Sequence, residues 1–130
     1  MRVMRKSSTN IRTSAKEASH ERIVDAAARA IRRSGYDGTG VADIMKEAGL
    51  THGAFYAHFA SREAMLAEAA DRAGAEANDL ATSVVASVPP EQALQSLIGV
   101  YLSKTHLQGI ETGCPTSALC SEMPRQSPEV

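Results

Sequence analysis

The sequence has no tryptophan, few aromatic residues and only two cysteines, and each of these scarcities excludes a class of protein. Aromatic residues make up 4% of the 130 residues, while alanine and other helix formers recur, which favours helices over strands. Cys114 and Cys120 are too few for a disulfide framework, and their spacing matches no zinc pattern. We therefore expect an all-α protein with reduced thiols, no metal and no cofactor.

Long apolar runs are absent as well. Nowhere do 18 apolar residues follow one another, and the basic residues at the N-terminus are not followed by the apolar segment of a signal peptide. These absences predict a cytoplasmic protein without a membrane partner.

The net charge of −1 is unevenly distributed along the chain. Residues 1–72 hold 12 Lys and Arg against 9 Asp and Glu, a balance of +3, whereas residues 73–130 hold 2 against 6, a balance of −4. A basic front half suits a polyanionic partner. A chance split on a soluble protein explains so small an excess equally well.

Three segments follow from composition and apolar spacing. Residues 1–18 are polar and basic without periodicity, which predicts a disordered arm. Residues 19–62 contain a helix from Ser19 to Gly35 and then two shorter helical blocks. Residues 63–130 continue with helical spacing up to the break at Pro89-Pro90 and beyond it.

The two shorter blocks predict a helix-turn-helix. Val41, Ile44, Met45 and Ala48 form one apolar stripe, Gly49 ends that helix, and Thr51 can cap a second helix that runs through Ala57. Phe55 and Phe59 stand four residues apart, so they reach the same core as Val41 and Ile44.

Beyond residue 62, Ser61 caps a long helix that reaches the proline pair. A further helix is expected from Glu91 to just before Gly109, and a weaker one from Pro115 past Met123. The apolar residues expected to face inward on the Glu91 helix are Leu94, Leu97, Ile98, Tyr101 and Leu102.

The stretch from Ile44 to Glu63 reads IMKEAGLTHGAFYAHFASRE. It resembles the signature of TetR-type regulators, in which an I-x-x-x-A-G turn precedes a G-x-x-Y-x-H-F helix and a serine-basic-acidic step. The resemblance covers about residues 19–72. It implies a three-helix bundle with a helix-turn-helix at 19–62, followed at 63–130 by the first helices of a ligand-binding and dimerisation domain. Family members continue through further helices, so we expect this chain to be truncated.

Two positions depart from the family pattern. Gly40 stands where a second serine or threonine is usual, and Met45 stands where a small residue is usual. The glycine predicts a weaker N-terminal cap on the helix that starts at Val41, and the methionine predicts fuller packing around position 45.

The residues expected to contact DNA lie around the second short helix. Gly49 permits a turn with positive φ, and Gly53 lets the backbone approach a partner closely. At the N-terminal end lie Thr51, His52 and Ala54, where His52 can donate to a purine acceptor and Ala54 can touch a thymine methyl. By resemblance, the phosphate contacts are Tyr56, Thr39, Thr51, His58 and Arg62.

Alternatives remain for two of these side chains. Tyr56 can simply cover an apolar edge, and His58 can bond to a nearby carbonyl group. Cys114 stands just before Pro115, and if it is exposed at this helix N-terminus its thiol pKa is expected to be lowered; the hypothesis is then a response to an oxidant or electrophile. The alternative is a small buried residue that helps a turn to pack.

The motifs predict a sequence-specific DNA-binding transcriptional regulator, a ligand-responsive repressor of the TetR type. Its expected partners are double-stranded operator DNA, a second copy of the chain once the full C-terminal domain is present, and a small-molecule effector. The alternative is a truncated helical interaction protein without operator binding. Enzymatic activity is not expected, because the histidines form no HExxH motif and no G-x-S-x-G elbow occurs.

Overall fold

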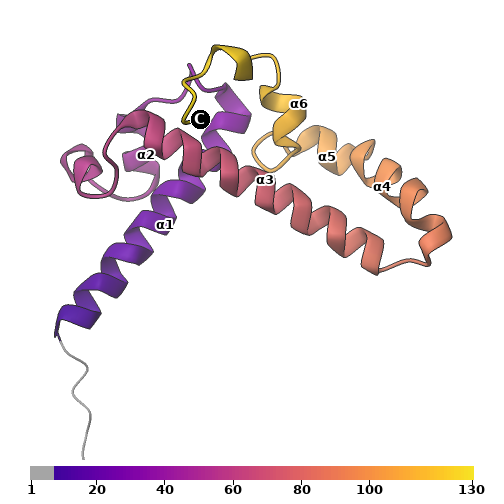
Figure 1. The fold of residues 1–130 in the computed structure, drawn as a ribbon, viewed down its shortest axis with the longest axis horizontal. Coiled ribbons are helices and arrows are strands. Elements are labelled where there is room, and N and C mark those ends of the chain that lie inside the picture. Colours follow the sequence, from indigo (N-terminus) through magenta and orange to yellow (C-terminus); the bar gives the residue numbers. More distant parts are fainter. Residues whose placement is uncertain (1–7) are drawn as a thin grey trace, which may run out of the picture.

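The computed structural model describes residues 8–130, and this part of the chain contains helices and no strand (Figure 1). The all-α fold expected from the sequence is confirmed. The α-helices and the short 3₁₀ helices, labelled η, are α1 (Ser8–Ser34), α2 (Val41–Glu47), η1 (His52–Ala57), α3 (Arg62–Ala86), η2 (Pro90–Gln92), α4 (Ala93–Tyr101), α5 (Lys104–Gln108), α6 (Pro115–Leu119) and η3 (Met123–Arg125).

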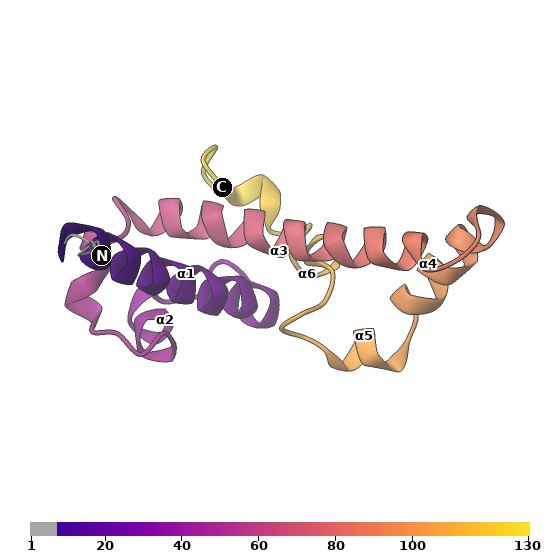
Figure 2. The same cartoon turned by 90° about the horizontal axis from the view of Figure 1, so that it is seen from below.

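The two long helices form the frame of the molecule. Helix α1 crosses the first half of α3 and packs against it (Figure 1), and α2 lies on the other side of α1 (Figure 2). Between them lies one apolar core, to which α1 contributes Ile23 and Ile31, α2 contributes Ile44, and α3 contributes Leu66. These side chains are at most 1% exposed, so burial of their apolar surface holds the helices together.

Helix α1 begins eleven residues earlier than predicted. The disorder expected for residues 1–18 is wrong for residues 8–18, which are helical, while residues 1–7 lie outside the described part. No glycine or proline interrupts the chain between Ser8 and Ser34, so the helix continues past its packed portion. Periodicity did not reveal this extension, because the side chains of residues 12–18 are exposed.

Sequence signals for helix ends are confirmed at four places. Gly35 and Gly49 have φ of +74° and +73°, the left-handed region that ends a helix at low cost only for glycine. The Ser61 hydroxyl accepts a hydrogen bond of 3.1 Å from the Ala64 amide and so caps α3. Helix α3 ends at Ala86, just before the proline pair.

The helix expected from Glu91 to Gly109 is divided into two. Helix α4 ends at Tyr101, and Ser103 caps α5 by accepting a bond of 3.1 Å from the His106 amide. The inward orientation expected for this helix is wrong for Leu94, Ile98, Tyr101 and Leu102, which are 71%, 50%, 49% and 75% exposed, whereas Leu97 is half-buried. Among the α-helices, α4 packs mainly against the distal part of α3, and this one contact leaves much of its apolar stripe uncovered (Figure 1).

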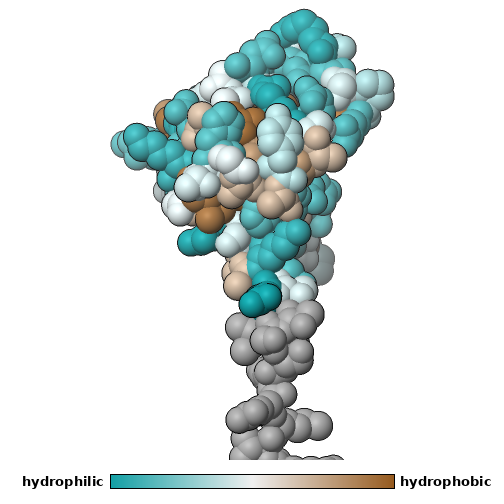
Figure 3. Space-filling model, turned by 90° about the vertical axis from the view of Figure 1, so that its left-hand side faces the viewer, coloured by the Kyte–Doolittle hydropathy of each residue, from teal (hydrophilic) through white to brown (hydrophobic). Residues whose placement is uncertain are grey.

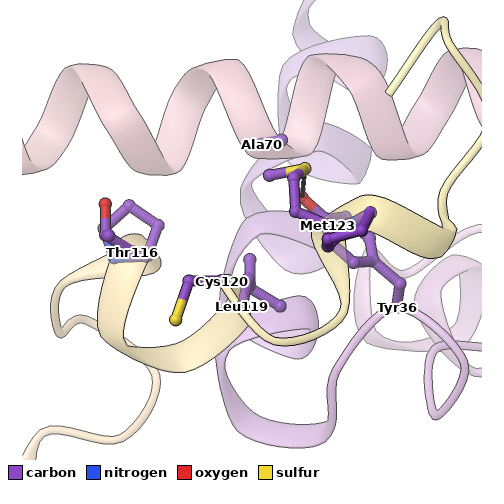
Figure 4. Close-up of a pocket in the computed structure, with 8 residues that line it drawn as sticks. Tyr36, Ala70, Thr116, Leu119, Cys120 and Met123 are labelled. Carbon is purple, nitrogen blue, oxygen red and sulfur yellow. Dashed lines mark hydrogen bonds between the residues drawn. The ribbon is translucent and has the colours of Figure 1, made fainter.

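The C-terminal segment returns to the helix-turn-helix domain. Leu119 is 1% exposed and belongs to the main core, and Met123 lies beside Tyr36 (Figure 4). A Glu122 carboxylate oxygen accepts a hydrogen bond of 3.1 Å from the Tyr36 amide. Burial and the Glu122 charge raise the pKa of the Tyr36 hydroxyl. The helix expected from Pro115 therefore exists but ends at Leu119, and Met123 belongs to the separate turn η3.

Among residues 8–130, no helix is both long enough and apolar enough to cross a membrane. In the same range, no group of three or more His, Cys, Asp and Glu side chains is arranged to hold a metal ion.

Candidate nucleic-acid interface

The turn between α2 and η1 is held by the backbone and by two aromatic rings. The Leu50 amide donates to the Met45 carbonyl at 2.9 Å, and the Gly49 amide donates to the Lys46 carbonyl at 3.0 Å. Phe55 and Phe59 are 1% and 5% exposed, and their rings stack with centroids 5.6 Å apart. The core positions predicted for both residues and for Ile44 are confirmed, while Val41 is only partly buried at the core edge.

The opposite side of η1 points away from the core. Thr51, His52 and Gly53 are exposed, and Tyr56 is 76% exposed with its ring packed edge-on against Phe55. No heavy atom lies within 4 Å of a Cβ placed on Gly53, and this glycine does not have a positive φ. The fold itself therefore does not require glycine at position 53.

The predicted second helix differs from the structure in type and in its cap. Residues 52–57 form a 3₁₀ helix, whereas an α-helix through Ala57 was expected. Thr51 takes the extended backbone conformation of an N-cap residue, but its side chain makes no capping hydrogen bond. Its exposed hydroxyl is therefore not committed to the helix end. Ala54 is half-buried and packs against the core edge.

Thr39 and Arg62 are engaged within the protein. Thr39 is 3% exposed, and its hydroxyl donates to the Gly35 carbonyl at 2.7 Å. The Arg62 guanidinium donates to the Tyr36 carbonyl at 2.5 Å and to the Thr39 carbonyl at 2.9 Å. Both side chains thus hold the loop that leads into α2, and a phosphate contact by Thr39 would require its present hydrogen bond to break.

His58 is half-buried beside the N-terminal half of α1. Its ring centroid lies 5.9 Å from that of His20, and its Nδ1 atom is buried with no hydrogen-bond partner among the described residues. Burial lowers the pKa of His58, and the nearby His20 and Lys16 lower it further. His20 in turn stacks on Phe59 at 4.5 Å and contacts Glu68 through Nε2 at 2.6 Å.

Several cations of the basic front half form ion pairs with carboxylates of the same chain. Arg72 pairs with Glu21 and Asp25, and Arg33 pairs with Glu47 at 3.0 Å and with Glu111 at 2.5 Å. Sequence counting cannot identify these pairs, because the partners lie far apart in the chain.

Lys46 is an exposed cation on α2 that the sequence analysis did not single out. Its position opposite the stripe of Ile44, Met45 and Ala48 is the signal that could have identified it. The face of the molecule that carries α2 and η1 is largely hydrophilic, with small scattered apolar patches (Figure 3).

Cys114 lies outside this surface. It occupies the N-cap position of α6 and is half-buried, and neither it nor Cys120 is in a disulfide. Burial raises the pKa of its thiol, but hydrogen bonds from Ser117 and Thr116 outweigh burial, so the pKa is lowered although the thiol is not fully exposed.

Comparison with known proteins identifies the fold. A solved chain described as "transcriptional regulator, TetR family, from Agrobacterium tumefaciens" superposes with a TM-score of 0.75 at 22% identity, over 88% of this chain and 60% of that one. The "Uncharacterized HTH-type transcriptional regulator YerO" of Bacillus subtilis (strain 168) is 34% identical over 82 residues. That alignment covers 61% of this chain and only 28% of the curated relative.

The chain therefore shares the helical fold of that solved chain, including its helix-turn-helix. Residues 23–69 match the family model of the "Bacterial regulatory proteins, tetR family", so this segment is similar to the helix-turn-helix domain of that family. The resemblance stated from residues 44–63 is confirmed.

Proposed function

We propose that this chain binds double-stranded DNA in a sequence-specific manner and acts in a ligand-responsive transcriptional repressor. The observation that carries the proposal is the exposed face of η1. Thr51, His52, Gly53 and Tyr56 project from a turn whose other side is fixed in the core. A rigid element that presents a small group of polar side chains is what major-groove recognition needs.

Within this surface we assign different roles to different side chains. The His52 imidazole reads a purine edge, while the methyl group of Ala54 lies against a thymine methyl. The Thr51 and Tyr56 hydroxyls bond to phosphate oxygens and set the register without reading sequence. Gly53 supports this assignment, because the open space above it leaves room for the DNA backbone.

Three further predicted contacts receive modified roles. Arg62 and Thr39 act mainly by fixing the loop before α2, although the Nη1 group of Arg62 remains available to a phosphate. His58 contributes to the junction between η1 and α1 and reaches a phosphate only at its exposed edge.

Two copies of the regulator would engage two half-sites about 34–36 Å apart on one face of the DNA. A second copy, the effector and cytoplasmic location are parts of the same proposal.

Oxidation of Cys114 stays a prediction. Loss of DNA binding after peroxide treatment, together with modified Cys114 in mass spectrometry, would support it.

Selection of duplexes from a random pool, followed by solution mass measurement, tests the proposal. A regulator should enrich one motif and bind it about 10³-fold or more tightly than a shuffled duplex. Weak binding without enrichment would instead support the alternative, a helical interaction protein that does not read operators. His52→Ala should relax the preference at one or two base positions, and Arg29→Ala on the exposed side of α1 is the matched control.

A further inference from the structure

The first turns of α1 extend beyond the packed body of the molecule. Helix α1 begins at Ser8, whereas the first buried side chain among the described ones is Ile23, and in Figure 1 the indigo turns project away from the other helices. The side chains of residues 12–18 are exposed, and we call these residues the overhang. Because the overhang is helical, the direction of each of its side chains is fixed by the helix.

Two cations of the overhang lie on the side of α1 that faces the core further along the helix. Lys16 and Arg12 precede the buried Ile23 by seven and eleven residues, which correspond to about two and three full turns. The three side chains therefore point in nearly the same direction, within about 40° around the helix axis. The inward side of α1 thus changes from apolar to basic where the packed body ends.

This basic side lies next to η1. Lys16 is close enough to His58, the residue that directly follows η1, for its charge to lower the pKa of that histidine. The His58 ring centroid also lies 5.9 Å from that of His20, one turn along α1 from Lys16. Arg12 lies one turn further out, about 12 Å along the helix axis from His20. The overhang therefore continues the exposed surface of η1 beyond the packed body.

Neither cation is neutralised within the described part of the chain. Arg12 and Lys16 form no ion pair there, in contrast to Arg33 and Arg72, each of which pairs with two carboxylates. The only acid among residues 12–18 is Glu17, which lies about 100° around the helix from Lys16. The basic side of the overhang is therefore available to an anionic partner.

We propose that the overhang binds the phosphate backbone of DNA just outside the bases that η1 reads, with Arg12 and Lys16 as the contacts. DNA is favoured as the occupant because a duplex that lies on η1 continues past the end of this helix and carries a phosphate charge at every step. Such contacts add affinity and fix the orientation of the protein without reading sequence. The assignment rests on the proposed function, because it needs η1 to lie on DNA.

Duplexes of two lengths test the contact. One duplex ends at the bases enriched by selection, and the other extends by about 10 base pairs at each end, one turn of the double helix. The variants are Arg12→Gln/Lys16→Gln and the matched control Arg22→Gln/Arg29→Gln, which removes the same charge from exposed positions on another side of α1. All four side chains are exposed, so both variants are expected to fold.

Fluorescence anisotropy across a salt series gives the expected difference. On the long duplex, the slope of log affinity against log salt concentration should become less steep by about 2 in Arg12→Gln/Lys16→Gln, one for each lost phosphate contact. The matched control should keep the slope of the wild type. On the short duplex, all three proteins should have the same slope, and a changed sequence in the added flanks should not alter any result.

Ethylation interference locates the contact on the DNA. In the wild type, ethylation of phosphates outside the enriched bases should weaken binding, and this interference should disappear in Arg12→Gln/Lys16→Gln. Equal salt slopes for this variant and the wild type on the long duplex, or an equal change in the matched control, would overturn the proposal. A wild type that prefers the selected duplex while the variant behaves identically would leave the proposed function standing. A wild type that binds no duplex would end both.

Discussion

At the scale of single residues, the two glycines of the helix-turn-helix have opposite reasons for being glycine. Gly49 has a φ of +73°, so Gly49→Ala should lower the free energy of unfolding by about 1 kcal/mol or more. Gly53 does not have a positive φ, and a Cβ there meets no atom within 4 Å, so Gly53→Ala should leave stability unchanged or slightly higher.

The pair separates folding from binding. Chemical denaturation and DNA affinity should be measured on both variants, and Gly53→Ala should weaken DNA binding although it folds normally. Undiminished affinity in Gly53→Ala would show that the DNA backbone does not approach this position.

His58 predicts a pH dependence of stability. Its pKa is lowered in the folded protein, so the unfolded chain binds the proton more readily. Above the unfolded-state pKa near 6.5, His58 is neutral in both states and does not destabilise the fold. Below that pH the unfolded chain takes up the proton more readily, so the free energy of unfolding falls as the pH falls. His58→Asn should reduce the acid destabilisation seen in denaturant titrations between about pH 6.5 and 5. The exposed His52→Asn is the control, and identical pH profiles for wild type and His58→Asn would contradict the assignment.

At the scale of secondary-structure elements, local signals predicted helix ends better than helix lengths. Gly35, Gly49 and Ser61 act through their own backbone or hydroxyl group, so their roles follow from the sequence. The start of α1 at Ser8 and the break at Ser103 depend on how far packing and hydration support a helix, and apolar spacing does not reveal either. Apolar spacing does not reveal the 3₁₀ form of η1 either.

Helix α2 begins without a side-chain cap, in agreement with the departure noted at Gly40. Gly40 has the extended backbone of an N-cap residue, and a Cβ there meets only an Asp43 oxygen at 3.9 Å. Gly40→Ser should therefore supply the missing acceptor and raise the free energy of unfolding by a few tenths of a kcal/mol, measured by thermal and urea unfolding. Gly40→Ala has the same backbone effect without the hydroxyl, and equal stability of the two variants would argue against capping.

At the scale of the whole molecule, the sequence did not predict the return of the C-terminal segment. Helix α6 was expected, but the burial of Leu119 in the main core and the bond from the Tyr36 amide to Glu122 are contacts between distant parts of the chain. The exposed surface of η1 was predicted more fully, because its motif is local. The hydrogen bonds that Thr39 and Arg62 make within the protein were not predicted, because their acceptors are backbone carbonyl groups whose positions depend on the fold.

The docking of the C-terminal segment predicts a long-range effect on stability. Leu119→Ala should lower the free energy of unfolding by about 2–5 kcal/mol, as expected for a buried leucine. It should also increase hydrogen exchange at the Tyr36 amide, because Glu122 loses its anchor. Leu107→Ala, which alters a leucine that is 79% exposed, is the matched control. Equal stability of both variants would show that the segment is not part of the core.

Recognition of DNA by the exposed side of η1 can be tested directly. Fluorescence anisotropy with a selected duplex and a shuffled one, across a salt series, measures this directly for the wild type, Tyr56→Phe and His52→Ala. Tyr56→Phe should weaken binding to both duplexes alike, whereas His52→Ala should reduce the preference by about 1–3 kcal/mol at the contacted base. If neither substitution alters the affinity or the preference of a folded protein, η1 does not recognise DNA and recognition lies elsewhere.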